Sequence, residues 1–561
     1  MSRQRPAPGR VVPAVLALVA AVGIGLVAFG VLAGRAVPVQ GPNGGPLPPE
    51  VGGEASGAKV RPGAVTVTAD PPSDVKAPGE AICAGCDVVL VTVCSLRKDY
   101  VSAYGLQPGL TPAIDALAAE GVRFDRAYAA SSFTLASLTA VLTGRFGSST
   151  GVLGWDKGLV ADVPTLPEVL GYYGYRTAGF TIDAASGFRP DYGLDRGFQR
   201  LEIVKPPRDT PDGRRRRGKP GAGGETAKPA AKWISEQPTD QPIFAMLHSR
   251  TAHFPFVIEK PTDDPTGVLQ ALWEAGGVLP PGKQAMPGDA GGTAQVGAVD
   301  LGGGDPAQEL VRKVGPAAIE VWRKAYADAV ARMDVDVKTL VEAVAARGRL
   351  DRTVFVVVGD HGESLWDHDE ALHGDAYFDT VANVPLVVRV PGIAPRADAA
   401  PALVSQVDLM PTILELVGAV PPTGIDGRSL LPLLRGEAET VREIALVEGG
   451  VAKNDASQLR GAVISLPFTL LRQPPGCGGG ADVTSPRSSD GSATCLYDLT
   501  ADPGQTKNLA RERPEVVEAL VDAWREFRAS RGAEARQLSL DPTFVETLRK
   551  SGYDFRSDAA P

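Results

Sequence analysis

The chain has 561 residues, of which 43% are hydrophobic and 22% charged, as in ordinary globular proteins. This composition excludes wholesale disorder and a membrane protein with many spans. The formal net charge of -9 argues against nucleic acid as the main partner, because phosphate binding needs a clustered basic surface. The length allows roughly two to four domains, or one large α/β domain.

The N-terminal residues have the pattern of a membrane segment. Arg3, Arg5 and Arg10 precede a continuous apolar stretch from Val11 to Ala33, which is long enough to cross a hydrocarbon layer of about 30 Å. We expect residues 1–36 to form an uncleaved transmembrane signal anchor, with a cleaved signal peptide as the alternative. Both alternatives predict that the rest of the chain lies outside the cytoplasm, in the periplasm or extracellular part of the cell envelope.

The remaining chain divides by composition. Residues 37–80 are rich in Pro and Gly and lack periodic apolar positions, which predicts a flexible linker. We expect the main catalytic domain at residues 81–440. After that point the strand signals become shorter, which predicts a smaller α+β subdomain at 441–530 and a tail at 531–561.

Strands and helices alternate through the main domain. Residues 87–93 are almost all apolar, as expected of a strand buried on both faces. Thr111 and Pro112 predict the N-cap and first turn of the following helix, and Thr165 with Glu168 predicts a capping box. Further strands are expected at 175–182, 243–247 and 353–358, with a long amphipathic helix from Ile319 to Val337. The alternation predicts an α/β fold with a mostly parallel central sheet and helices on both faces.

The C-terminal region contains two short strand signals, at 443–447 and 462–471, and a helical pattern from Pro514 to Ala529. Cys477 and Cys495 bracket a Gly-rich loop, and we expect a disulfide between them in an oxidising compartment. Cys83 and Cys86 form a CxxC pair without a second pair or a nearby His to complete a zinc site. We interpret that pair as structural.

All five histidines follow two predicted strands: His248, His253, His361, His368 and His373. In open α/β sheets, ligands bind beyond the carboxyl ends of the strands. The motif from Asp360 to Glu363 directly follows one of these strands and offers neighbouring oxygen and nitrogen donors for a divalent metal. The sequence therefore predicts a site at this edge of the sheet.

Thr134 is the candidate nucleophile. Its hydroxyl is expected at the start of a helix, where free backbone N–H groups favour an anionic substrate. The alternative interpretation is that Thr134 is simply the N-cap of that helix.

Motifs in chain order resemble those of the sulfatases, in the alkaline phosphatase superfamily, from about Asp87 to Leu509. The segments that carry the resemblance are 87–105, 121–128, 142–145, 174–178, 253–255, 360–363, 384–389, 407–412, 426–431, 496–503 and 508–509. The resemblance implies an alkaline phosphatase-like fold and an ester hydrolase with a divalent cation. Counting back from the Thr-Gly-Arg motif at 143–145 places Thr134 at the nucleophile position.

The resemblance also implies roles for residues of this chain. Thr134, His253 and His373 are expected to be catalytic. Asp360 and His361 are expected to bind the metal, together with Cys94. The resemblance implies a divalent cation without identifying it, so Ca²⁺, Mg²⁺, Mn²⁺ and Zn²⁺ all remain candidates.

Several positions depart from the family pattern. The family has one or two Asp after the first strand, where this chain has Cys94 and Ser95. Leu138 replaces an Arg that supports the nucleophile, Thr150 replaces a His, and Asp99 lies one turn too far along to substitute. The nucleophile is usually a Cys or Ser converted to formylglycine, which Thr134 cannot become. The departures indicate a weakened site for hard cations and a preference for softer ions such as Zn²⁺.

Three hypotheses about function follow. The first is a hydrolase of sulfate or phosphate esters that acts outside the cytoplasm on a glycan or a lipid. The second is a pseudo-sulfatase that keeps the fold but acts as a binding protein. The third is a phosphoryl or phosphoglycerol transferase of the cell envelope with Thr134 as its nucleophile. In each case the N-terminal helix is expected to hold the protein at the membrane.

Overall fold

The computed structural model describes residues 81–105, 107–181, 187–204, 227–253, 256–257, 278–279, 317–370, 372–374, 376–396, 400–449, 460–473, 477, 493–530 and 535–538. The expected signal anchor at 1–36 and linker at 37–80 lie outside these ranges. Within the ranges, no helix has the length and apolar character needed to cross a membrane. The boundaries expected at 440 and 530 stay predictions.

An eight-stranded sheet forms the centre of the fold, in the order β11-β2-β10-β9-β1-β6-β4-β5. Strand β10 runs antiparallel to β9 and β2, and the other pairings are parallel. This confirms the predicted α/β class with a mostly parallel sheet. The strands are β1 (Asp87–Val93), β2 (Val122–Tyr128), β4 (Arg176–Thr181), β5 (Arg200–Ile203), β6 (Ile243–Ser249), β9 (Thr353–Gly359), β10 (Leu386–Arg389) and β11 (Ala400–Ser405).

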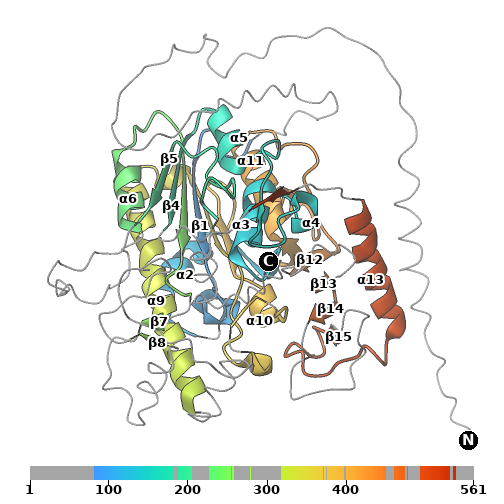
Figure 1. Cartoon of the computed structure of the whole chain (residues 1–561). Helices are drawn as coiled ribbons and strands as arrows, with labels where there is room; N and C mark the ends of the chain where they lie inside the picture. The colour runs from blue at the N-terminus through green and yellow to red at the C-terminus, as the bar shows by residue number, and fades with distance from the viewer. Residues whose placement is uncertain are drawn as a thin grey trace, which may run out of the picture. The chain divides into compact units, whose positions relative to one another are not determined.

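Helices cover both faces of this sheet, as predicted (Figure 1). Alternate residues of β1 point to opposite faces, so Val88 and Leu90 enter one core while Val89 and Val91 enter the other. One face carries α3 (Thr134–Thr143), α5 (Leu166–Tyr172) and α11 (Leu409–Val417); the other carries α2 (Pro112–Ala119), α6 (Ala227–Glu236) and α9 (Ala317–Ala346). Burial on both faces explains the near-continuous apolar sequence of β1.

Shorter elements complete the described part of the chain. The helices are α4 (Gly147–Thr150), α10 (Asp379–Ala382), α12 (Leu431–Leu434) and α13 (Pro514–Ala529). The strands outside the central sheet are β3 (Lys157–Gly158), β7 (Phe256–Val257), β8 (Val278–Leu279), β12 (Ala445–Glu448), β13 (Gly461–Ser465), β14 (Phe468–Gln473), β15 (Ala493–Asp498) and β16 (Arg536–Gln537).

The predicted start of α2 is confirmed, with Thr111 at the N-cap position and Pro112 in the first turn. The Thr111 hydroxyl, however, makes no capping bond to the helix. The carboxylate of Asp334 in α9 accepts hydrogen bonds from the backbone N–H groups of Ala113 and Ile114, at 2.8 and 3.0 Å. A tertiary contact therefore satisfies the N–H groups that the local sequence was expected to satisfy. The capping box of Thr165 and Glu168 is also confirmed.

A separate antiparallel sheet, β12-β13-β14-β15, lies in the C-terminal region, where the smaller subdomain was expected. The single strand signal at 462–471 is in fact a hairpin of β13 and β14. The prediction missed the turn at Leu466 and Pro467, because apolar residues on both sides made the signal look continuous. The Cys477–Cys495 disulfide is present, and Cys83 is bonded to Cys86.

Candidate active site

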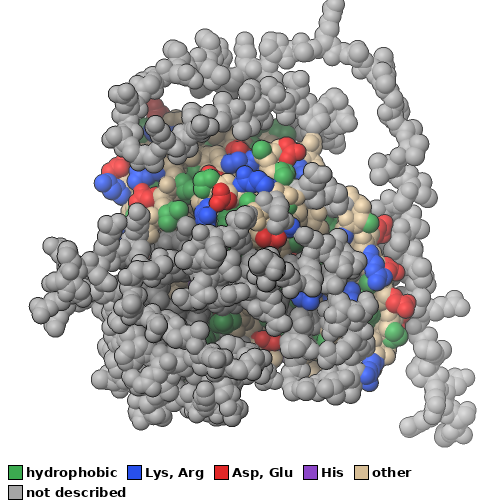
Figure 2. All heavy atoms as spheres, in the orientation of Figure 1, with side chains coloured by type: hydrophobic (Ala, Val, Ile, Leu, Met, Phe, Trp, Pro, Cys, Tyr) green, Lys and Arg blue, Asp and Glu red, His purple; other side chains and the backbone are tan. Residues whose placement is uncertain are grey.

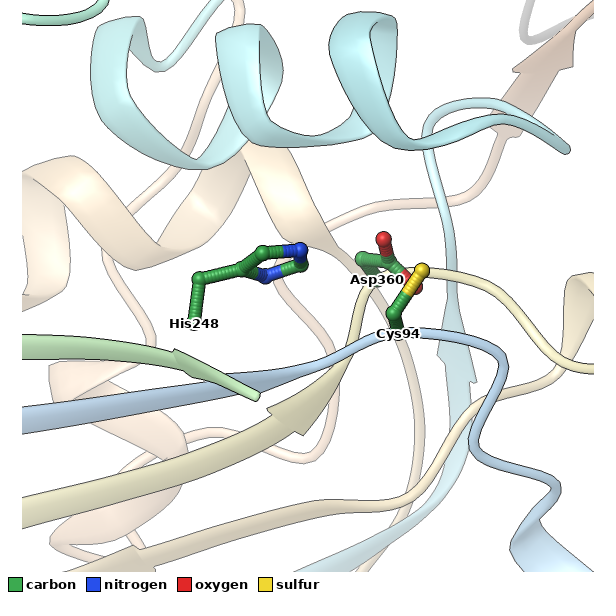
Figure 3. Close-up of side chains that lie close together, drawn as sticks. All are labelled: Cys94, His248 and Asp360. Carbon is green, nitrogen blue, oxygen red and sulfur yellow. The ribbon is translucent and has the colours of Figure 1, made fainter. Parts of the chain in front are cut away.

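The site lies where three adjacent parallel strands end. Strand β1 pairs with β9 on one side and with β6 on the other, in a register that aligns Val93 with Gly359 and Thr92 with His248. Cys94 and Asp360 therefore follow neighbouring strands at the same level, and His248 is the penultimate residue of the third. Their candidate ligand atoms all lie within 4.8 Å of one another. Figure 3 shows the three side chains converging from these strand ends.

Thr134 lies beside this cluster, at the start of the helix α3. It is the first residue of α3, whose N-cap is Phe133, so the alternative that Thr134 is the N-cap is wrong. The Thr134 hydroxyl lies 3.2 Å from Cys94 Sγ and 3.3 Å from His361 Nε2. The N-terminus of α3 adds partial positive charge beside the hydroxyl, which favours an anionic group there.

The hydrogen bonds of His361 identify its tautomer. Its Nδ1 lies 2.9 Å from the carbonyl oxygen of Gly362, which can only accept, so Nδ1 carries the hydrogen. The lone pair is therefore on Nε2, and the Thr134 hydroxyl donates to it. Burial lowers the pKa of His361 to about 4, so the ring is neutral near pH 7.

Backbone N–H groups bind one of the two carboxylate oxygens of Asp360. Its Oδ1 accepts hydrogen bonds from the N–H groups of Ser95 and His361, at 3.0 and 2.7 Å. Its Oδ2 has no hydrogen-bond partner among the described residues, although the side chain is fully buried. A buried carboxylate oxygen in this state costs about 1–3 kcal/mol, which a bound cation would offset.

His248 also has only one of its two ring nitrogens in a hydrogen bond to a described residue. Its Nδ1 lies 3.0 Å from the Thr92 hydroxyl, whereas its Nε2 has no hydrogen-bond partner among the described residues. The ring is fully buried, and this burial lowers its pKa to about 4. Burial also raises the pKa of the Cys94 thiol, Asp360 raises it further, and Arg250 opposes this rise. The cluster thus contains a neutral imidazole, a thiol and a carboxylate.

Two further histidines lie beside the cluster. The rings of His361 and His373 are 4.2 Å apart between centroids, and those of His373 and His253 are 5.2 Å apart. His373 Nδ1 donates to the buried carboxylate of Glu363, at 2.9 Å. Such a pair fixes the orientation of the ring and suits it to proton transfer.

Arg250 provides positive charge that the sequence motifs did not reveal. Its Nη2 donates to His253 Nε2 at 3.0 Å, which makes Nε2 the acceptor and leaves the hydrogen on Nδ1 of His253. Arg250 is only 9% exposed, and its charge acts on the Cys94 thiol. An anionic substrate in the site would therefore meet a buried cationic side chain.

The structure brings Thr134, His253, His373, Asp360, His361 and Cys94 together at one edge of the sheet. His368 stacks instead on Phe378, with 3.6 Å between ring centroids. Thr150 bonds to the backbone of its own helix, Leu138 is a core residue, and Asp99 pairs with Arg97. These three residues therefore do not supply the His, the Arg or the Asp that the family pattern has in this part of the site.

On the face that Figure 2 displays, acidic and basic side chains are interspersed among the coloured residues, and no histidine is visible among them. This agrees with the burial of His248, His253, His361 and His373, each at most 8% exposed.

Gly362 allows the loop after β9 to pack closely, and it provides a test of that packing. A Cβ at this position would overlap the carbonyl oxygen of Thr380. We expect Gly362→Ala to lower the free energy of unfolding by about 1–3 kcal/mol, since the backbone must move. Gly171→Ala is the control, because nothing lies within 4 Å of its Cβ and helical Ala gains about 0.5–1 kcal/mol. Urea denaturation of both variants measures the difference; equal effects would contradict the close packing.

Comparison with known proteins identifies the family. A sequence model of the family described as Sulfatase matches residues 87–419. The chain belongs to the sulfatase family. Among relatives, a Δ4,5-hexuronate-2-O-sulfatase of Bacteroides thetaiotaomicron is 26% identical over 442 residues, covering 75% of this chain and 84% of the relative. Rat arylsulfatase K is 27% identical over 208 residues, covering 35% of this chain and 33% of that protein.

Solved structures share the fold of this sulfatase. A putative sulfatase from Bacteroides thetaiotaomicron superposes with a TM-score of 0.59 at 20% identity, covering 82% of this chain and 96% of the other. A phosphonate monoester hydrolase of Agrobacterium radiobacter superposes with a TM-score of 0.57 at 21% identity, covering 81% and 97%. These likenesses extend over most of each solved chain, which supports the alkaline phosphatase-like architecture.

Sulfatases generally use a divalent metal cation, and the residues here fit one. The buried Oδ2 of Asp360 and Nε2 of His248 have no hydrogen-bond partners among the described residues, and candidate ligand atoms of these two residues and Cys94 lie within 4.8 Å of one another. The donor set is mixed, however, with a single carboxylate in the cluster. Such a set suits a borderline or soft ion better than Ca²⁺, which takes six to eight oxygen ligands.

Sequence reasoning missed three contributors to the site. His248 was noted only as one of five histidines, and its predicted strand ended one residue before it. Arg250 has no motif of its own, and Glu363 was grouped with the metal motif although its carboxylate orients His373. The only available signal was their position after a buried strand, which does not specify a partner.

Proposed function

We propose that this sulfatase hydrolyses sulfate or phosphate esters outside the cytoplasm, with Thr134 as the nucleophile. The observation that carries the proposal is the contact of the Thr134 hydroxyl with His361 Nε2, at 3.3 Å. A threonine hydroxyl is a weak nucleophile unless a neighbouring base accepts its proton. The tautomer of His361 makes Nε2 that base.

In the proposed reaction, Thr134 Oγ1 attacks the sulfur or phosphorus atom while its proton passes to His361 Nε2. The ester bond to the leaving alcohol breaks, and that alcohol receives a proton. Water then attacks the same sulfur or phosphorus atom and loses a proton to the solvent, the bond to Thr134 Oγ1 breaks, and His361 returns its proton to Oγ1 as sulfate or phosphate leaves. A bound cation would supply charge neutralisation at the ester oxygens.

The surrounding residues support the leaving group and the anion. His373 is the proposed proton donor to the leaving alcohol: in its imidazolium form it donates from Nε2, while Nδ1 stays bonded to Glu363. Arg250 and His253 provide hydrogen-bond donors on the same side of the site, and the N-terminus of α3 favours the transferred group. This set of donors suits a tetrahedral anion of either sulfur or phosphorus.

A sulfated sugar is the substrate class we infer. The relatives include sulfatases named for hexuronate and for N-acetylglucosamine. A solved structure with a TM-score of 0.57 contains D-glucosamine-2-N,6-O-disulfate. The extracytoplasmic location is supported by two disulfides, which persist in oxidising compartments, and by the apolar N-terminal stretch.

The test is to trap the covalent intermediate. The full chain, purified in detergent, is mixed with 4-nitrophenyl sulfate, 4-nitrophenyl phosphate or sulfated glucosamine and quenched in acid. We expect a sulfo or phospho group on the peptide that contains Thr134, found by mass spectrometry. An adduct on another residue would contradict the assignment. Product without an adduct on Thr134 would also contradict it, provided that a synthetic sulfothreonine peptide survives the same quench.

The substrates also separate the alternative functions. Release of free sulfate or phosphate indicates hydrolysis. Transfer of the group from phosphate substrates to added glycerol, without free phosphate, indicates a transferase. Binding of sulfated glucosamine without product or adduct indicates a pseudo-sulfatase and contradicts the proposal.

A further inference from the structure

Three donors of different chemistry meet at the ends of β1, β6 and β9. Cys94, His248 and Asp360 are each fully buried, and their candidate ligand atoms lie within 4.8 Å of one another (Figure 3). Each comes from a strand of the central sheet or the residue directly after it. The parallel register of three paired strands therefore sets the spacing of the cluster.

Two atoms of this cluster have unmet bonding capacity. Asp360 Oδ2 and His248 Nε2 have no hydrogen-bond partners among the described residues, and both side chains are inaccessible to solvent. The other polar atoms of the same side chains are satisfied, since Asp360 Oδ1 binds two backbone N–H groups and His248 Nδ1 contacts Thr92. Buried polar groups are rarely left unpaired in native proteins. Two such atoms on side chains that cluster with a thiol indicate a ligand that accepts electron pairs.

The donor types select the ion. Zn²⁺ binds Cys, His and carboxylate ligands at about 2.0–2.3 Å, which places tetrahedral neighbours about 3.3–3.8 Å apart. Small side-chain movements of about 1 Å bring the three donors to these separations. Thr134 Oγ1 lies 3.2 Å from Cys94 Sγ, so the nucleophile hydroxyl is beside the three donors. Three protein ligands and one open position are typical of catalytic zinc sites.

The charges of the ligands also favour Zn²⁺. A divalent ion deprotonates a thiol that coordinates it. The Cys94 thiolate and the Asp360 carboxylate would then balance the two charges of the ion, with His248 neutral. Ca²⁺ and Mg²⁺ instead require oxygen ligands, of which the cluster provides one carboxylate. The buried site would therefore hold a hard cation poorly.

We propose that Cys94, His248 and Asp360 bind Zn²⁺, and that this sulfatase uses zinc in place of a hard cation. His361 is then free to accept the proton of Thr134, because His248 takes the ligand role. The catalytic role of this zinc rests on the proposed function, because the ion belongs to the same active site. Its binding can nevertheless be measured without turnover.

The test uses the full chain in detergent, stripped with a chelator and reloaded with Zn²⁺, Co²⁺, Ca²⁺ or Mg²⁺. We expect about one Zn²⁺ per chain by elemental analysis and tighter binding of Zn²⁺ than of Ca²⁺ or Mg²⁺. Co²⁺ should give a thiolate-to-metal charge-transfer band in the near ultraviolet. Of the five Cys, four are in disulfides and Cys94 is the free thiol, so the band must come from Cys94.

Variants assign the ligands. Cys94→Ser should abolish the cobalt band, and His248→Ala should weaken Zn²⁺ binding by about 100-fold or more. His368→Ala is the matched control, because His368 stacks on Phe378, and it should bind Zn²⁺ normally. Cys94→Asp should shift the preference toward Ca²⁺ and Mg²⁺, which also checks that the site tolerates substitution. Circular dichroism confirms that each variant is folded.

The outcomes separate this inference from the proposed function. A cobalt spectrum unchanged in folded Cys94→Ser, or tighter binding of Ca²⁺ than of Zn²⁺, overturns the zinc site. Zinc bound through Cys94 and His248 without ester hydrolysis supports the site and contradicts the proposed function. If the protein hydrolyses esters but neither binds Zn²⁺ nor is stabilised by it, the zinc site is contradicted and the proposed function is not.

Discussion

Thr134→Ala should lower kcat/KM for ester hydrolysis by about 10³-fold or more, because removing a nucleophile eliminates the covalent route. The side chain is 2% exposed and contacts Cys94 Sγ and His361 Nε2. Thr134→Ser keeps the hydroxyl at the start of α3, so it should retain activity within about 10-fold of the wild type. Steady-state kinetics with 4-nitrophenyl sulfate and 4-nitrophenyl phosphate measure both changes.

Thr139→Ala is the matched control for this prediction. Thr139 lies in the same helix and is equally buried, but its hydroxyl donates to the carbonyl oxygen of Leu135 at 2.7 Å. Its replacement should leave kcat/KM within about 3-fold of the wild type. Substantial turnover by folded Thr134→Ala would remove this residue from the chemistry, and a common loss in both variants would indicate damage to α3.

Asp87→Ala should lower the free energy of unfolding by about 3–5 kcal/mol, the usual effect of breaking a buried ion pair. Asp87 is fully buried at the start of β1, where its carboxylate binds the guanidinium groups of Arg347 and Arg349 and the backbone N–H of Ile243. The substitution leaves buried positive charge without its counterion. Chemical denaturation followed by circular dichroism measures the loss.

Asp125→Ala provides the comparison for this buried pair. Asp125 forms an ion pair with Lys98 at 3.3 Å, but its side chain is 47% exposed. Solvent screens such a pair, so its loss should change the free energy of unfolding by less than about 1 kcal/mol. Similar losses in the two variants would show that the Asp87 cluster has no special role in holding β1.

Much of the fold could be predicted from local pattern. The apolar run of β1 and the long stripe of α9 are confirmed, since burial on both faces or on one face imposes those sequence patterns. The capping box at Thr165 follows from contacts within four residues. The hydrogen bonds from Asp334 to the first turn of α2 could not be predicted, because Asp334 is more than 200 residues away along the chain.

Part of the site could also be predicted. Asp360 and His361 follow directly after a buried strand, and Thr134 lies a fixed distance before a recognisable motif. The cluster of Cys94, His248 and Asp360 could not be specified in this way. It depends on β1 lying between β6 and β9 in one particular register, and many strand orders are compatible with the same alternating sequence.

The sequence by itself determined the α/β class, the family and the residue types available for chemistry, because these depend on periodicity and on short motifs. The tertiary structure decided which of those residues meet. It placed His248 beside Cys94, Arg250 beside His253 and Glu363 beside His373. Strand order and register arise from packing between distant segments, which no local pattern records.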